Sequence, residues 1–286
     1  MWVESCSKRV DYSINWKCAW IRGLGSELGF GGRDKSRPYD LTTLEILENT
    51  DSLLEILYQD ADLIAIDKRA GLLVHRSRVD AQETQFALQM LRDQIGQEVH
   101  PCHRLDKPTS GVLLFALNRE AHRRAQVAFA EQRTEKTYHA VVRGWLDGSG
   151  VIDYPLRNED KPDKVQDAFT EYACLSQSTV EVPVGRYPSA RFSLVELRPK
   201  TGRTHQLRRH MAHLRHPILG DTRHGDGVQN RFLRAHNGQQ MLLLRAVRLQ
   251  MPHPVTGKAL DIRAGVDAAF EAALERLRLS RLGSRL

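Results

Sequence analysis

Short apolar runs separated by turn signals dominate the chain from Leu54 onward, and this pattern constrains the fold more than any other feature. Most runs have the length of strands, and residues 192–197 alternate between two faces as a half-buried strand does. Helical spacing is confined to a few segments, and no regular βαβ alternation or glycine-rich dinucleotide fingerprint accompanies it. We therefore predict an α+β fold with a mixed, mostly antiparallel sheet flanked by helices. The predicted strands are 54–60, 63–67, 72–76, 111–117, 136–144, 168–175, 191–199, 241–251 and 259–264, and the predicted helices are 83–95, 119–133, 201–217 and 267–279.

The first part of the chain lacks this pattern. Residues 1–52 crowd five glycines between positions 23 and 32 and show no sustained period, so we expect a weakly ordered extension with one short helix at 42–53. Charged residues interrupt the first twenty positions, and no apolar run approaches the roughly 18 residues of a membrane span, which indicates neither export nor membrane insertion. Four scattered cysteines without a CxxC pair fit a reducing cytoplasm.

Basic charge is concentrated in residues 201–248. This stretch holds nine arginines and only two acids, Asp221 and Asp226, so its surplus of +7 equals the net charge of the whole chain. Guanidinium and imidazole groups suit phosphate oxygens and exposed base edges. The alternative is a solvated helix face with ion pairs, but the scarcity of acids within the stretch argues against it. We therefore expect a polyanionic partner, most simply a nucleic acid.

Two segments carry candidate chemistry. In HRLDKPTSG, residues 103–111, a turn that opens a buried strand presents Asp106, although an Asp before Lys-Pro is by itself more typical of an Asx-turn. The segment PKTGRTHQLRRH, residues 199–210, runs from a strand through a glycine turn into a basic helix. This order places Arg203 near a helix start, from which it can reach a carboxylate in the same cleft and keep that carboxylate charged.

Together with KTYHAVVRG and HPILGD, these motifs resemble the RluA-type pseudouridine synthases, in the same order and spacing over residues 53–265. The resemblance implies that residues 53–286 form a pseudouridine synthase catalytic domain with a central cleft. It implies a reaction in which the base of a uridine is detached, turned and rejoined through carbon 5, without metal, nucleotide or redox cofactor. The segments GRYPSARFSLVEL and HPVTG look closer to a subgroup that modifies transfer RNA, which implies uridine 65 of the T stem as the target.

The resemblance also implies roles for individual residues. Asp106 is the catalytic carboxylate, and its attack on the sugar or base, or its removal of a ribose proton, remain alternatives. Arg203 is its ion-pair partner. Tyr138 lies against the uracil ring and Leu207 lines the pocket, although each would by its own pattern be a core residue. Arg104 holds the stack open after the base is extruded. The remaining predicted substrate-binding residues are His103, Arg208 and Arg209.

Several alternatives compete with this interpretation. The triplet Lys200-Thr201-Gly202 occurs in penicillin-binding serine enzymes, but the chain has no SDN motif and the match is accidental. An RNA-binding module without chemistry and an enzyme acting on ribosomal RNA both remain open. The run of His205, His210, His213 and His216 contains no HExxH motif, acid or cysteine, so we predict no metal site. We expect a monomeric cytoplasmic enzyme with transfer RNA as its partner.

Overall fold

The computed structural model describes residues 53–75, 84–159, 161, 163–238, 241–265 and 267–280. The predicted extension 1–52, and the helix predicted at 42–53 except for Leu53, lie outside these residues. Among the described helices, none has the length and apolar character that crossing a membrane requires.

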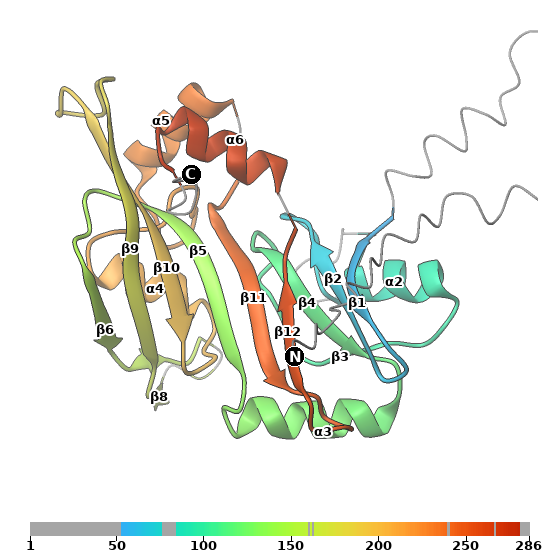
Figure 1. Cartoon of the computed structure of the whole chain (residues 1–286). Coiled ribbons are helices and arrows are strands. Elements are labelled where there is room, and N and C mark those ends of the chain that lie inside the picture. The colour runs from blue at the N-terminus through green and yellow to red at the C-terminus, as the bar shows by residue number, and fades with distance from the viewer. Residues whose placement is uncertain are drawn as a thin grey trace, which may run out of the picture. The chain divides into compact units, whose positions relative to one another are not determined.

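A ten-stranded sheet forms the framework of the described chain (Figure 1). Its strand order is β1-β2-β4-β11-β5-β10-β9-β6, with β3 paired to β4 and β12 paired to β11. The pairing of β4 with β11 is parallel and the other pairings are antiparallel, which confirms the predicted mixed, mostly antiparallel sheet. The sheet strands are β1 (Glu55–Gln59), β2 (Leu63–Lys68), β3 (His100–Pro101), β4 (Ser110–Ala116), β5 (Glu135–Arg143), β6 (Ser149–Asp153), β9 (Phe169–Val180), β10 (Ala190–Pro199), β11 (Leu244–Pro252) and β12 (Ala259–Arg263), and a separate pair comprises β7 (Leu156–Arg157) and β8 (Val165–Gln166).

The described helices follow the predicted periods with one addition. Helix α5 was not predicted, although Asp226 caps its first N–H groups and Gly238 ends it in a left-handed conformation. The strand predicted at 72–76 is wrong over the described part, because only Leu73 makes an isolated bridge, to Phe86. The helices are α2 (Ala87–Ile95), α3 (Arg119–Ala130), α4 (Gln206–His213), α5 (Gly227–Asn237) and α6 (Ala268–Arg276).

Helices cover both faces of the sheet, so the central strands are apolar on both sides. On β4, Leu114 belongs to the cluster under α3, whereas Leu113 and Phe115 belong to the cluster under α2. On β5, Val141 packs in the cluster that contains α5 and α6, whereas Ala140 packs in the cluster that contains α4. This two-sided burial explains why these strands read as continuous apolar runs.

Close backbone contacts near the segments that carry Asp106 and Asp221 require glycine at two positions. Gly111 in β4 has φ +107°, and a Cβ there would lie 2.0 Å from the Ala246 carbonyl oxygen of β11. Gly220 has φ +78°, and a Cβ would lie 1.7 Å from the Met241 carbonyl oxygen. Both positions demand a residue without a side chain. They set the placement of the segments that carry Asp106 and Asp221.

Candidate active site

A cleft of about 520 Å³ opens where the loop before β4, strand β5 and the start of α4 meet. Its lining comes mainly from residues 102–106 and Thr109, from the end of α3, from the β5 face and from residues 199–208. The two motifs that are about a hundred residues apart in the sequence thus form one concave site. The structure brings seven of the eight predicted site residues to this cleft, namely His103, Arg104, Asp106, Tyr138, Arg203, Leu207 and Arg208.

The Asp106 carboxylate faces cationic and imidazole groups inside the cleft. It lies in a turn closed by a hydrogen bond from the Thr109 N–H to the Asp106 carbonyl, and its side chain is 21% exposed. Arg208 Nη1 donates to Asp106 Oδ2 at 3.2 Å, and His205 Nε2 lies 3.7 Å from the same oxygen. The carboxylate is therefore oriented but still reachable from the cleft.

The predicted partner of Asp106 is wrong in this structure, because Arg208 and not Arg203 makes the ion pair. Arg203 lines the cleft, but its Nε donates to the carbonyl oxygen of Asp167 at 2.9 Å. The reason is the backbone turn ahead of α4. His205 has φ +53° at the helix start, and the buried Gln206 binds the Arg203 N–H and Thr201 Oγ1. This turn directs Arg208, one turn into the helix, toward the cleft floor.

Asp221 holds Arg208 in place, and the sequence analysis missed this role. Arg208 donates Nε and Nη2 to the two Asp221 carboxylate oxygens at 2.8 and 2.7 Å, and only Nη1 reaches Asp106. Burial would raise the pKa of Asp221, but the bonds from Arg208 and from the N–H groups of His224 and Arg223 keep that pKa below its ordinary value. The HPILGD motif was the available signal, since it ends at this carboxylate.

Tyr138 and Leu207 each combine the two roles that the sequence left as alternatives, a pocket residue and a core residue. Each lines the cleft, and each also packs in the apolar cluster beneath α4. Burial, reinforced by the charge of Asp106, raises the pKa of Tyr138, so its phenol stays neutral. A neutral aromatic ring beside the carboxylate suits stacking on a flat base.

The other predicted substrate-binding residues differ in their surroundings. Arg104 is exposed at the cleft. His103 Nε2 accepts the Leu114 N–H at 3.1 Å, and burial together with the Lys136 charge lowers the pKa of His103 to about 4. Arg209 is half-buried outside the cleft lining, and its Nη1 donates to the Arg157 carbonyl at 2.8 Å.

The basic stretch 201–248 contains more ion pairs than its own acids allow. Arg223 pairs with Glu159, Arg248 with Asp261, and the buried Arg245 with both Asp67 and Asp267. The scarcity of acids within the stretch therefore does not exclude ion pairs, because acids outside the stretch supply them. Exposed arginines of the stretch, available to an anionic partner, are Arg215, Arg231 and Arg234.

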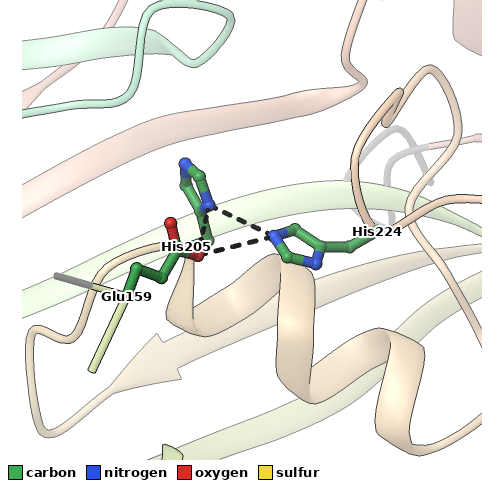
Figure 2. Close-up of side chains that lie close together, drawn as sticks. All are labelled: Glu159, His205 and His224. Carbon is green, nitrogen blue, oxygen red and sulfur yellow. Dashed lines mark hydrogen bonds and ion pairs between the residues drawn. The ribbon is translucent and has the colours of Figure 1, made fainter. Parts of the chain in front are cut away.

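The histidine run splits between packing and the cleft. His210 is buried between Thr170 Oγ1 and the Tyr154 carbonyl, and His213 stacks on the Tyr154 ring with centroids 3.7 Å apart. His205 instead lies at the cleft edge, where its Nδ1 contacts Glu159 and His224 (Figure 2). Burial lowers the pKa of His224, the positive charge of Arg208 lowers it further, and the negative charge of Asp221 only partly offsets this. The ring is therefore neutral near pH 7.

Comparisons with known proteins point to one enzyme family. A model described as RNA pseudouridylate synthase matches residues 62–213. The tRNA pseudouridine synthase C of Vibrio cholerae is 52% identical over 231 residues, which cover 78% of this chain and 95% of that protein. The Pasteurella multocida protein of the same name is 55% identical over 223 residues, covering 75% and 92%. Among solved structures, human RNA pseudouridylate synthase domain containing 4 aligns with a TM-score of 0.62 at 26% identity, covering 84% of this chain and 97% of that one.

Proposed function

Since the chain belongs to the RNA pseudouridylate synthase family, we propose that it converts one uridine of transfer RNA to pseudouridine with Asp106 as the catalytic carboxylate. The names of relatives that are about half identical support transfer RNA as the substrate class. The family resemblance supports uridine 65 of the T stem as the target. The observation that carries the proposal is the Asp106–Arg208 ion pair inside a cleft that also presents Tyr138.

The reaction is an isomerisation that needs no external redox partner. The bond between N1 of uracil and C1′ of ribose breaks, the base turns, and a bond forms between C5 and C1′. The proton lost from C5 is balanced by a proton gained at N1. Asp106 attacks C1′, adds to the base or removes a ribose proton, and each route needs the carboxylate to face the nucleotide.

The chain's own residues account for orientation around this step. Asp221 fixes Arg208, and Arg208 fixes one oxygen of Asp106, so the carboxylate is positioned before substrate arrives. Tyr138 offers an aromatic face for the uracil ring, and Leu207 closes the apolar side of the cleft. A uridine in a stem reaches this cleft only when it is flipped out, and exposed Arg104 at the cleft is suited to the vacated stack.

We also propose that residues 53–286 act as one catalytic unit and as a monomer in the cytoplasm. The support for one catalytic unit is that the cleft is lined by residues drawn from positions 102 to 244. The free Cys102 and Cys174 agree with a reducing compartment.

Asp106→Asn tests the catalytic assignment. It keeps the shape of the side chain but removes the negative charge, so we expect turnover to fall by at least about a thousandfold while transfer RNA affinity stays within about tenfold. Release of tritium from uridine labelled at C5 measures the reaction directly, because that hydrogen leaves. Asp93→Asn, on the exposed surface of α2, is the matched control and should retain full turnover.

The turnover assay tests the catalytic assignment against a binding module, and a second measurement tests the substrate. Turnover that survives in Asp106→Asn removes the carboxylate from the reaction. An absence of turnover in the parent chain despite RNA binding favours a binding module without chemistry. Mapping pseudouridine in cells lacking the gene, in transfer RNA beside ribosomal RNA, decides the substrate, and loss at position 65 alone is the expected result.

A further inference from the structure

Three side chains from separate segments converge beside the cleft (Figure 2). Glu159 follows β7, His205 stands at the start of α4, and His224 lies in the turn before α5. His205 Nδ1 lies 3.0 Å from Glu159 Oε1 and 3.1 Å from His224 Nε2, and His224 Nε2 lies 3.9 Å from Glu159 Oε1. Two imidazole nitrogens and one carboxylate oxygen therefore face a common point.

Hydrogen bonding does not give each of these three atoms a partner of its own. When His205 Nδ1 carries a hydrogen, Glu159 and His224 share that one donor. If Nδ1 is instead an acceptor for His224, its lone pair faces the Glu159 oxygen. A single cation at the common point would satisfy the three atoms together.

The spacing matches a metal-ligand set. With bonds of about 2.0–2.1 Å, two ligands of a tetrahedral zinc ion lie about 3.3–3.4 Å apart. The observed separations of 3.0, 3.1 and 3.9 Å bracket that value. Two histidines and one carboxylate are also the usual donors of an open site that leaves a position for water or an inhibitor.

Surrounding contacts hold Glu159 and the backbone at His224 in place. Arg223 Nη2 binds the other Glu159 oxygen, Oε2, at 2.9 Å and leaves Oε1 for the common point. The N–H of His224 donates to Asp221 Oδ1 at 2.9 Å. The side chains of Glu159, His205 and His224 are only 20%, 14% and 20% exposed. This outer support is what metal ligands in proteins generally have.

We propose that Glu159, His205 and His224 bind a divalent transition-metal ion of the zinc class. A metal on His205 Nδ1 leaves the ring hydrogen on Nε2, which faces Asp106 Oδ2 at 3.7 Å. A chain of contacts from Asp106 through the His205 ring to the metal then links the ion to the proposed catalytic group. If the proposed function holds, metal binding ties Asp106 to His205 as well as to Arg208 and lowers turnover.

The sequence argument against a metal considered only acids inside the histidine run. Glu159 precedes His205 by 46 residues, so the fold alone brings the carboxylate in. A second cluster comprises Asp60, Asp62 and His253. It differs because both carboxylate oxygens of Asp60 already have hydrogen-bond partners. Its Oδ1 accepts two backbone N–H groups, and its Oδ2 contacts Tyr58 and His253. This second cluster is the internal control.

The test is a titration of the full chain, stripped of metal by a chelator, with Zn²⁺ by calorimetry and with Co²⁺ by visible absorption. We expect one Zn²⁺ per chain with micromolar or tighter affinity, and a tetrahedral Co²⁺ spectrum. His224→Gln should weaken binding by more than about tenfold, since it removes a ligand rather than an outer contact. His253→Gln should leave Zn²⁺ affinity unchanged. Glu159→Gln is a second variant in case His224→Gln unfolds.

Absence of saturable Zn²⁺ binding, or equal affinity in the parent, His224→Gln and Glu159→Gln, overturns the site. These binding measurements use no RNA, so they remain valid even if the proposed enzymatic function fails. In the turnover assay, Zn²⁺ should slow the parent several-fold and His224→Gln less, each compared with its own chelated form. Tight binding without this difference overturns the link to Asp106.

Discussion

Two buried arginines of this protein each bridge two aspartates, yet they lie in very different places. Arg208 links Asp221 to Asp106 at the cleft, and Arg245 links Asp67 to Asp267 between β2, β11 and the start of α6. Their side chains are 6% and 2% exposed. The same three-group arrangement thus occurs once in the core and once at the candidate site.

The difference lies in what the outer carboxylates face. Arg245 also donates to Ser110 Oγ and to the Gly265 carbonyl, so its guanidinium joins several segments. Arg208 has fewer partners, and its Nη1 contacts only a carboxylate that opens onto the cleft. We call the Arg245 triad closed because none of its three groups lines the cleft, and the Arg208 triad open because Asp106 does. A buried ion-pair triad can thus take part in chemistry when one of its carboxylates faces the cleft, and otherwise contributes to folding.

The largest expected effect is on stability, at the closed triad. Arg245→Met leaves Asp67 and Asp267 without their cation, and we expect a loss of about 3–5 kcal/mol in the free energy of unfolding. Adding Asp67→Leu and Asp267→Asn removes both stranded charges and keeps the α6 cap, so most of the loss should be recovered. Urea unfolding measures both steps. Equal stability of the single and triple variants would contradict the closed-triad interpretation.

Low pH should reduce the free energy of unfolding through His103. Its pKa of about 4 lies below the value near 6.5 in the unfolded chain, so only the unfolded state takes up a proton between these values. Stability therefore falls as pH falls from about 6.5 to about 4, by up to about 3 kcal/mol. His103→Gln should flatten this dependence when urea unfolding is compared near neutral pH and near pH 4.5. An unchanged slope would show that His103 is not the group responsible.

Arg208→Lys tests the open triad. A lysine keeps the charge but cannot contact Asp221 through two nitrogens and Asp106 through a third. We expect kcat to fall by about 10- to 100-fold with little change in KM for transfer RNA. Arg245→Lys, assayed well below its unfolding temperature, should retain kcat. A fall of similar size in both variants would mean that the two triads do not differ in function.

The smallest effect is expected at an arginine with only surface partners. Arg248 makes a two-nitrogen contact with Asp261 at 2.6 and 2.7 Å, but its side chain is 34% exposed. Arg248→Ala should change stability by less than about 1 kcal/mol, and added salt should reduce that change further. Thermal unfolding at low and high salt measures it. A loss comparable with that of Arg245→Met would mean that burial does not decide the energy of these pairs.

Local periodicity predicted most of the fold, and its failures have local causes. The helical spacing of Ala87 and Leu91 predicts α2, and Gly96 ends that helix in the left-handed conformation. Helix α5 was not predicted because its apolar positions are few, although the Asp226 cap and the Gly238 stop were visible in the sequence. The strand predicted at 72–76 failed because short apolar runs do not by themselves distinguish strand from loop.

The sequence by itself determined which motifs this protein carries, and with them Asp106, Tyr138 and Leu207 as residues that share one cleft. Only the tertiary structure decided which arginine pairs with Asp106, because five positions along a tight turn and helix separate Arg203 from Arg208. It also brought Glu159 to His205. The physical reason is that periodicity and turn chemistry act over a few residues, whereas ion pairs depend on where distant segments meet after the sheet has formed.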